Sequence, residues 1–188
     1  MKKVLTLSAL MIAAIVLLAG CTNPFSKNSN STNDANTAAN EVSHEVTLLN
    51  GYTTYNGDTY SVNYPSDWTT EETTSAGSPM TEFFSPAKTS TVNVVSVQSA
   101  VSFTLDAYKD EVVNQIQSSD TKVNNVEKVT VNGYDAYRIA YDMNTGTSTV
   151  TIKQTLLVHG KNSYAITFAG LDTDEAVYQN MENSFVMK

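Results

Sequence analysis

From about residue 45 onward, the chain consists of short runs in which apolar and polar residues alternate, separated by tight-turn dipeptides. Successive side chains of a strand point to opposite faces, so this alternation is typical of half-buried strands. Asn-Gly favours a two-residue hairpin turn, because both central residues of that turn need positive φ. The pattern therefore predicts an antiparallel sheet rich in hairpins. The turn dipeptides are Asn50-Gly51, Asn56-Gly57, Asn132-Gly133 and His159-Gly160.

The clearest strands are expected between residues 122 and 169, where apolar side chains occupy one face of each of three successive runs. Short turns separate the runs, so a meander of three or four antiparallel strands is the economical prediction. Earlier strands are expected over residues 60–64, which Pro65 ends, and over residues 80–84 and 91–98. The three apolar sets are Tyr137, Ile139, Tyr141 and Met143, then Val150, Ile152, Leu156 and Val158, and finally Tyr164, Ile166 and Phe168.

Two segments have helical periodicity instead. Over residues 104–118, apolar side chains recur three or four positions apart, Thr104 suits an N-cap, and Asp106 suits the positive end of the helix dipole. Near the C-terminus, Asp172 and Glu175 have the spacing of a capping box, and an apolar stripe follows. Each helix should lay its stripe on the sheet, so we expect an α+β fold with a central antiparallel sheet flanked by helices. The stripes are Leu105, Tyr108, Val112 and Ile116, and Val177, Met181 and Phe185.

The first twenty-one residues predict where the protein resides. Lys2 and Lys3 precede an apolar run over residues 4–19, and small residues then lead to Cys21. A cationic start, an apolar middle and small residues at the cleavage point are typical of a secretory signal, and a cysteine directly after the cut is typical of a lipoprotein. The alternative, a membrane-spanning helix, needs about 20 apolar residues with a lower limit of about 17. We therefore expect residues 1–20 to be a signal peptide and Cys21 to carry a lipid anchor.

The composition of the rest of the chain changes near residue 44, which separates a polar segment from a globular one. Residues 21–44 are rich in Asn, Ser and Thr and contain too few large apolar groups to fold, so we expect a flexible tether. Residues 45–188 are expected to form one globular domain. Without the two lysines of the signal peptide, 9 basic residues stand against 19 acidic ones, a net charge of −10. This charge argues against binding to nucleic acid, and the single arginine, Arg138, argues against a bidentate phosphate or carboxylate clamp.

No catalytic, cofactor-binding or metal-binding residue is expected. Cys21 is the only cysteine, so its acylation leaves no thiol for a disulfide or a metal. His44 lies beside the tether, His159 is expected as an exposed turn residue, and their spacing is not that of metal ligands. Acidic residues near position 175 lack the glycine and glutamate that a calcium loop requires. Nucleophile elbows and phosphate-binding loops are absent from the sequence, which argues against an enzyme. The acidic residues are Asp172, Asp174 and Glu175.

Four tyrosines near the first hairpin are a candidate aromatic binding surface. Rings displayed on a sheet can stack against a sugar or a protein partner. The alternative is that tyrosine suits strands and fills half-buried positions, and alternation places at most half of the four on one face. The four are Tyr52, Tyr55, Tyr60 and Tyr64, with Trp68 just beyond them.

The segment over residues 58–68, DTYSVNYPSDW, resembles the opening of the PsbP-like family, in which an aromatic-rich strand ends in Tyr-Pro-x-x-Trp. The order of the later elements is similar too. A helix follows over residues 104–118, VNGYDAY over 131–137 enters a strand, YAITF occupies 164–168, and a closing helix ends at Ser184-Phe185. The resemblance covers roughly residues 58–187.

The resemblance implies an α/β/α sandwich around a central antiparallel sheet, and a protein that binds and scaffolds rather than catalyses. It assigns no particular functional residue. Our first hypothesis is therefore a lipoprotein, anchored through Cys21 at the extracytoplasmic face of the cell membrane, whose partner is another envelope protein. The alternative is a module that binds a small ligand, an ion or a glycan through its surface.

Overall fold

The computed structural model describes residues 47–117, 121–146, 148–170 and 174–188. The expected signal peptide, Cys21, the tether, His44 and Asp172 lie outside these ranges. Strands dominate the described part, and two helices accompany them, so the predicted α+β class is confirmed. The elements are β1 (Tyr52–Asn56), β2 (Tyr60–Pro65), β3 (Thr69–Ser75), β4 (Ser78–Phe84), β5 (Thr91–Gln98), α1 (Leu105–Gln117), β6 (Thr121–Val131), β7 (Tyr134–Asn144), β8 (Thr149–His159), β9 (Asn162–Ala169), α2 (Glu175–Asn183) and β10 (Val186–Met187).

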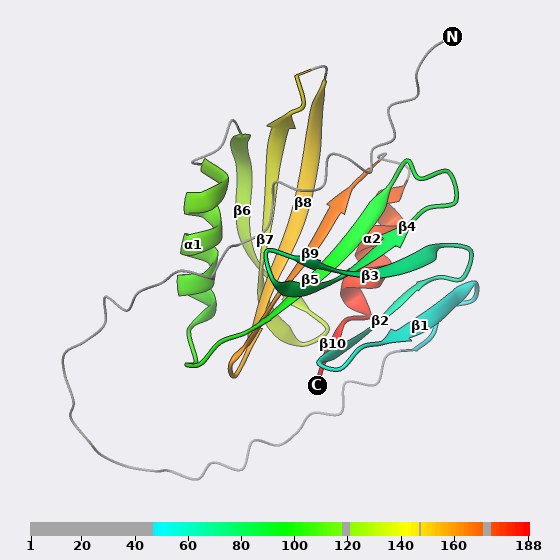
Figure 1. Ribbon diagram of the computed structural model, residues 1–188, viewed down its shortest axis with the longest axis horizontal. Coiled ribbons are helices and arrows are strands. Elements are labelled where there is room, and N and C mark those ends of the chain that lie inside the picture. Colours follow the sequence, from blue (N-terminus) through cyan, green and yellow to red (C-terminus); the bar gives the residue numbers. More distant parts are fainter. Residues whose placement is uncertain (1–46, 118–120, 147, 171–173) are drawn as a thin grey trace, which may run out of the picture.

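Seven of the strands form one sheet in the order β3-β4-β5-β9-β8-β7-β6, and every neighbouring pair is antiparallel (Figure 1). The predicted meander is confirmed, because β6, β7, β8 and β9 follow one another in the chain and in the sheet. The one long-range pairing joins β5 to β9, from Thr91 opposite Ala169 to Gln98 opposite Asn162. This pairing places α1 and three strands in the connection between two neighbouring strands.

Helix α1 covers one face of the large sheet. Its Tyr108, Val112 and Ile116 are buried against β7, β8 and β9, as the helical spacing predicted. The Ala107 amide donates a hydrogen bond to the Thr104 hydroxyl at 3.2 Å, so the predicted N-cap is confirmed. We call this group the α1 cluster; its sheet members are Ile139, Tyr141, Ile152, Leu156, Ala165 and Ala169.

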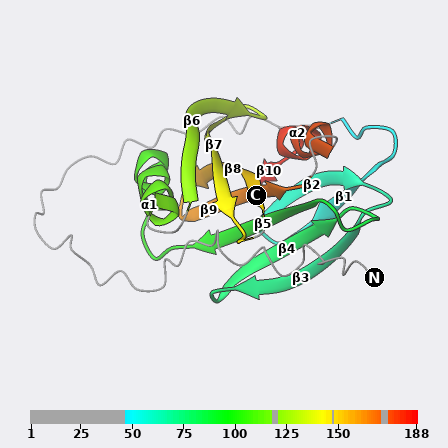
Figure 2. The same cartoon turned by 90° about the horizontal axis from the view of Figure 1, so that it is seen from above.

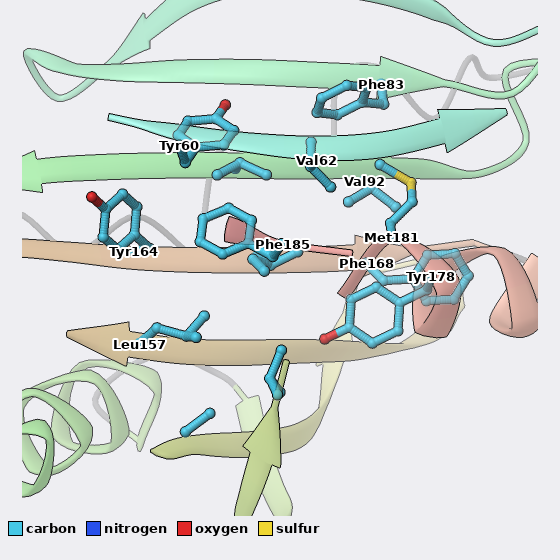
Figure 3. Close-up of a cluster of buried hydrophobic side chains, with 14 of the residues drawn as sticks. Tyr60, Val62, Phe83, Val92, Leu157, Tyr164, Phe168, Tyr178, Met181 and Phe185 are labelled. Atoms are coloured by element: carbon cyan, nitrogen blue, oxygen red, sulfur yellow. The ribbon is translucent and has the colours of Figure 1, made fainter. Parts of the chain in front are cut away.

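The opposite face carries α2 and a second sheet of order β1-β2-β10 (Figure 2). Side chains of β2, of α2 and of the C-terminal segment pack there against β4, β5, β8 and β9 (Figure 3). The two helices therefore lie on opposite faces, as the family resemblance implied, while the small sheet was not expected. We call this group the aromatic cluster; its main members are Tyr60, Val62, Phe83, Val92, Leu157, Tyr164, Ile166, Phe168, Tyr178, Met181 and Phe185.

The structure differs from the sequence predictions at both ends of the globular part. Strand β3 was not predicted, because its sequence is polar throughout and it forms an exposed edge of the sheet. Helix α2 ends at Asn183, so Phe185 does not belong to its apolar stripe. Phe185 is nevertheless fully buried, because the chain turns after Ser184 and β10 pairs with β2. At the other end of α2, Asp174 occupies the N-cap position without a side-chain capping bond.

One predicted hairpin turn also connects distant parts of the chain. Asn132 and Gly133, between β6 and β7, have φ values of 45° and 81°. Both are positive, as the two central residues of the predicted hairpin turn require. The Asn132 side-chain amide donates to the Phe185 carbonyl at 3.0 Å. The turn therefore holds the segment that follows α2 in place.

An acidic pair lies across the β3–β4 hairpin. Glu71 and Glu82 occupy directly opposite positions, where like charges destabilise a sheet. Burial, and secondarily the charge of Glu71, raise the pKa of the Glu82 carboxyl above 4.5. A raised pKa means that the folded state binds the proton more tightly than the unfolded chain. The ionised Glu82 therefore destabilises the fold above its folded pKa, and this penalty disappears as the pH falls below 4.5.

Replacing this carboxylate should stabilise the protein in a pH-dependent way. We expect Glu82→Gln to raise the free energy of unfolding at pH 7 by at most about 0.5 kcal/mol, because the half-buried side chain is screened by water. The gain should vanish in acid, as measured by urea unfolding at several pH values. Glu71→Gln should give part of the same gain. A gain that does not change with pH would show that charge is not its cause.

Candidate functional site

The structure separates the four predicted tyrosines. Tyr60 is buried in the aromatic cluster with 4% of its surface exposed, whereas Tyr52, Tyr55 and Tyr64 are half-buried. The Tyr52 hydroxyl accepts a hydrogen bond from the Asn180 amide at 3.1 Å, and Tyr64 packs on Phe83. The Tyr55 and Tyr60 rings lie together, with centroids 5.6 Å apart. The structure therefore does not display the four rings on one exposed face, and the aromatic binding surface stays a prediction.

Tyr55 and Tyr60 line a pocket of about 280 Å³ between the β1–β2 loop and strands β3, β4 and β5. We call it the tyrosine pocket. Its volume is near the lower end for small-molecule sites, which span about 300–1,000 Å³. Pro79 and Met80 contribute apolar surface, while Asp58 and Glu72 contribute carboxylates. Of the described residues that line it, none is basic.

A chain of hydrogen bonds runs along the pocket from the core to its edge. Tyr60 donates to Thr81 Oγ1 at 2.8 Å, Thr81 donates to the Tyr55 hydroxyl at 3.2 Å, and Tyr55 donates to Glu72 Oε1 at 2.8 Å. An ionised carboxylate only accepts, so the direction of every bond in the chain follows from Glu72. Each of the three hydroxyl hydrogens is therefore already used within the chain.

The surroundings hold this chain in place. The Tyr60 ring stacks on Phe185 at 5.1 Å, and its hydroxyl points away from Phe185 (Figure 3). A Cβ on Gly57 would approach Cε1 of Tyr55 to 2.9 Å, so a larger residue there would displace the ring. Burial raises the pKa of both phenols above the ordinary value of 10.0, so they remain neutral donors at physiological pH.

A second polar cluster lies under α2. The Arg138 guanidinium binds Glu182 through two bonds, Nε to Oε1 at 3.2 Å and Nη2 to Oε2 at 2.6 Å, and also binds Glu127 at 3.2 Å. Glu182 is fully buried and accepts a further bond from the Thr155 hydroxyl. Since that hydroxyl hydrogen is used, Tyr178 must donate to Thr155, at 2.6 Å. We call these five residues the arginine cluster.

The arginine cluster fastens α2 to the sheet. Glu127, Arg138 and Thr155 are cross-strand neighbours on β6, β7 and β8, and they meet Glu182 of α2 above them. Hydrogen bonding to Glu182 is the main cause that raises the pKa of Arg138, so the guanidinium stays charged. A pocket of about 210 Å³ beside it contains one more ion pair, in which Lys153 lowers the pKa of Glu175. Both cations of this pocket already have carboxylate partners.

The structure also places two residues that the sequence analysis considered as metal ligands, His159 and Glu175. His159 is exposed at the end of β8, as predicted. Glu175 pairs with Lys153 in the first turn of α2. Within the described ranges, no three side chains of the metal-binding types gather in one place. None of the helices in the described part has the length and apolar character needed to cross a bilayer.

The sequence did not predict the carboxylates that accept hydrogen bonds in the tyrosine pocket and in the arginine cluster. Glu72 lies in the unpredicted strand β3, and Glu182 lies on a helix of which only the apolar stripe had been assigned. The expectation that Arg138, as the only arginine, forms no bidentate carboxylate clamp was wrong, because it binds the buried Glu182 carboxylate through two bonds. Nothing in the local sequence of Thr81 or Thr155 indicates its role, because each contacts residues 21 or more positions away.

Removing the guanidinium should be costly because it leaves the Glu182 charge buried and unpaired. We expect Arg138→Met to lower the free energy of unfolding by about 3–5 kcal/mol. Adding Glu182→Met to that variant should recover much of the loss, since no unpaired buried charge then remains. Urea unfolding of the four proteins of this double-mutant cycle measures both effects. Additive losses would show that the two side chains act independently.

Comparisons with known proteins agree with this architecture. Residues 8–186 match the sequence profile of the PsbP-like protein family. The solution structure of cyanobacterial PsbP from Synechocystis sp. PCC 6803 superposes with a TM-score of 0.57 at 15% identity, covering 74% of this chain and 94% of that chain.

Two further solved structures share the fold at low identity. A protein from Bacteroides thetaiotaomicron VPI-5482 has a TM-score of 0.53 and 16% identity, with 69% of this chain and 45% of that chain covered. A protein of unknown function from Pseudomonas aeruginosa has a TM-score of 0.51 and 12% identity, with 73% and 97% covered. No curated protein sequence matches the chain significantly. The profile match spans nearly the whole chain, and the protein therefore belongs to the PsbP-like family.

Proposed function

We propose that this protein is a lipid-anchored binding module at the extracytoplasmic face of the cell membrane, and that it acts by binding rather than by catalysis. The observation that carries the anchor is the N-terminal sequence, in which two lysines and an apolar run lead to the single cysteine, Cys21. Membership of the PsbP-like family supports a binding role.

The proposed anchor and tether have physical consequences. One acyl chain holds a protein only marginally, each buried methylene contributing about 0.8 kcal/mol, so stable attachment needs at least two chains. A diacylated Cys21 meets this requirement. A coil of the composition and length of residues 21–44 spans roughly 25–30 Å, which is enough to lift the folded part clear of the lipid headgroups.

A protein partner in the envelope is the proposed target, and strand β6 is the surface that supports it. This 11-residue strand forms one edge of the large sheet, and residues 124–128 in its middle, which include Val126, are all exposed. An edge strand offers unpaired backbone groups to which a partner strand can add. A register shift near Val123 interrupts its pairing at one end, so residues 125–131 are its regular part.

The tyrosine pocket favours a second candidate function, the binding of a small ligand. It combines a partly exposed ring, apolar contacts and carboxylates in one concave site. The two functions are compatible, because β6 and the pocket lie at opposite edges of the sheet.

The anchor can be tested directly. In cells fed an alkyne-tagged fatty acid, the full chain should incorporate the label, and its mature N-terminal peptide should begin with a modified Cys21. Cys21→Ser should abolish the label, because no other thiol is present. Thr22→Ser, one residue further on, should leave labelling unchanged. An intact leader together with an unmodified thiol, seen by mass spectrometry, would refute the proposed anchor.

The partner can be tested by site-specific photo-crosslinking in intact cells. A photoreactive residue in place of Val126 should give one discrete adduct with an envelope protein. The same residue in place of Thr70, which is exposed on the opposite edge strand β3, should not give that adduct. Equal adducts from both edges, or none from β6, would contradict partner binding at this edge.

A further inference from the structure

We infer that the tyrosine pocket binds a small ligand through a protonated amine, such as the ammonium group of an amino sugar. This inference rests on the second candidate function above and adds the chemical class of its ligand. It follows from the hydrogen-bond chain along the pocket and from the charge of the residues that line it.

The hydrogen-bond chain leaves the pocket rich in acceptors. Tyr60, Thr81 and Tyr55 each have one hydroxyl hydrogen, and each hydrogen points to the next member of the chain. What they still offer is lone pairs. Glu72 accepts from Tyr55 through Oε1, and its Oε2 remains as a further acceptor. A ligand that bonds to the members of this chain must therefore supply donors.

The charge of the pocket selects a cation among donor-rich ligands. Asp58 and Glu72 both line it, and no described lining residue is basic, so an anion in the pocket would be repelled by two carboxylates. An ammonium group has three donors and no acceptor. Its attraction to the Tyr55 ring adds a cation–π contribution. Pro79 and Met80 then contact the carbon skeleton of the ligand.

The loop beside the pocket already receives an ammonium group. The Lys188 Nζ donates to the Gly57 carbonyl at 2.7 Å, and the Lys188 backbone amide donates to the Thr59 carbonyl at 2.9 Å. Gly57 and Thr59 both line the pocket, while Lys188 does not. The two carbonyls are therefore used by a residue outside the pocket, and the Tyr164 hydroxyl also donates to the Thr59 carbonyl, so these contacts fix the position of the loop.

Three sugars that share one pyranose ring distinguish recognition of the ammonium charge from recognition of the ring. Glucosamine carries the amine, glucose lacks it, and N-acetylglucosamine has it neutralised. We expect glucosamine to bind the full chain at about pH 6, where ordinary amines are protonated, at least about tenfold more tightly than the other two, equivalent to about 1.4 kcal/mol. NMR chemical-shift titration, followed at the amide of Gly57, measures the affinities.

Two adjacent glutamates provide a matched control. Glu72 and Glu71 lie side by side on β3 but face opposite sides of the sheet, opposite Thr81 and Glu82 respectively. Glu72→Gln keeps an acceptor for Tyr55 and removes the charge, so it should weaken glucosamine binding about tenfold. Glu71→Gln makes the same change of charge on the same strand and should leave the affinity within about twofold.

Asp58→Asn is a second variant that removes a carboxylate from the pocket. Because Asp58 is exposed on the loop, this change tests the role of charge even if Glu72→Gln fails to fold. Asp58→Asn should weaken glucosamine binding without lowering the melting temperature. Equal affinities for the three sugars, no saturable shift up to about 50 mM glucosamine, or binding that is insensitive to both Glu72→Gln and Asp58→Asn would each overturn the inference. Saturable binding of glucose with equal affinity would retain a ligand-binding function while refuting the amine. Acyl labelling and photo-crosslinking test the anchor and the partner independently of all these outcomes.

Discussion

Strand β9 is buried on both faces, and the two hydrophobic clusters meet along it. Every residue from Ser163 to Ala169 is buried. Its large side chains, Tyr164, Ile166 and Phe168, enter the aromatic cluster, while alanines at positions 165 and 169 face the α1 cluster. Small side chains on one face leave room for α1 to approach, and aromatic ones on the other fill the wider space under α2 and the small sheet. Because β5 and β8 flank β9, burial is greatest in the middle of the sheet and the edges β3 and β6 can be polar.

The tyrosine pocket depends on this core through the C-terminal segment. Phe185 stacks on Tyr60 and contacts Tyr164 at 5.4 Å, so it fills the space between β2 and β9. With its ring held there, Tyr60 directs its hydroxyl to Thr81 on β4, and the chain of hydrogen bonds continues outward to Glu72. The same segment is held by the Asn132 amide at the β6–β7 turn. The packing of Phe185 in the core thus determines where the hydroxyl groups of the pocket lie.

The two polar clusters differ in what they leave available. In the arginine cluster, the buried carboxylate of Glu182 is saturated by Arg138 and Thr155, which suits a structural fastening of α2. In the hydrogen-bond chain of the tyrosine pocket, the three hydroxyl hydrogens are used and acceptors remain, which suits the recognition of a ligand. This difference, rather than the number of polar residues, is why we assign binding to the pocket. The family and the solved structures establish the fold, and the proposed ligand chemistry comes from this chain's own residues.

Much of the fold could be predicted from local patterns, because strand alternation, helical periodicity and turn geometry act between residues close in the chain. The meander over residues 122–169, the helix capped by Thr104 and the Asn132-Gly133 turn were all predicted in this way, whereas the PsbP-like family was predicted from the resemblance of several motifs in order. Strand β3 was missed because its polar sequence has no alternation, and the pairing of β5 with β9 has no local signal. The tyrosine pocket also has no local signal in the sequence, because its residues are distant in the chain. Tyr55, Thr81 and Glu72 come from three strands, and only the order of the sheet and the packing of the small sheet against it bring their hydroxyl and carboxylate groups within hydrogen-bond distance.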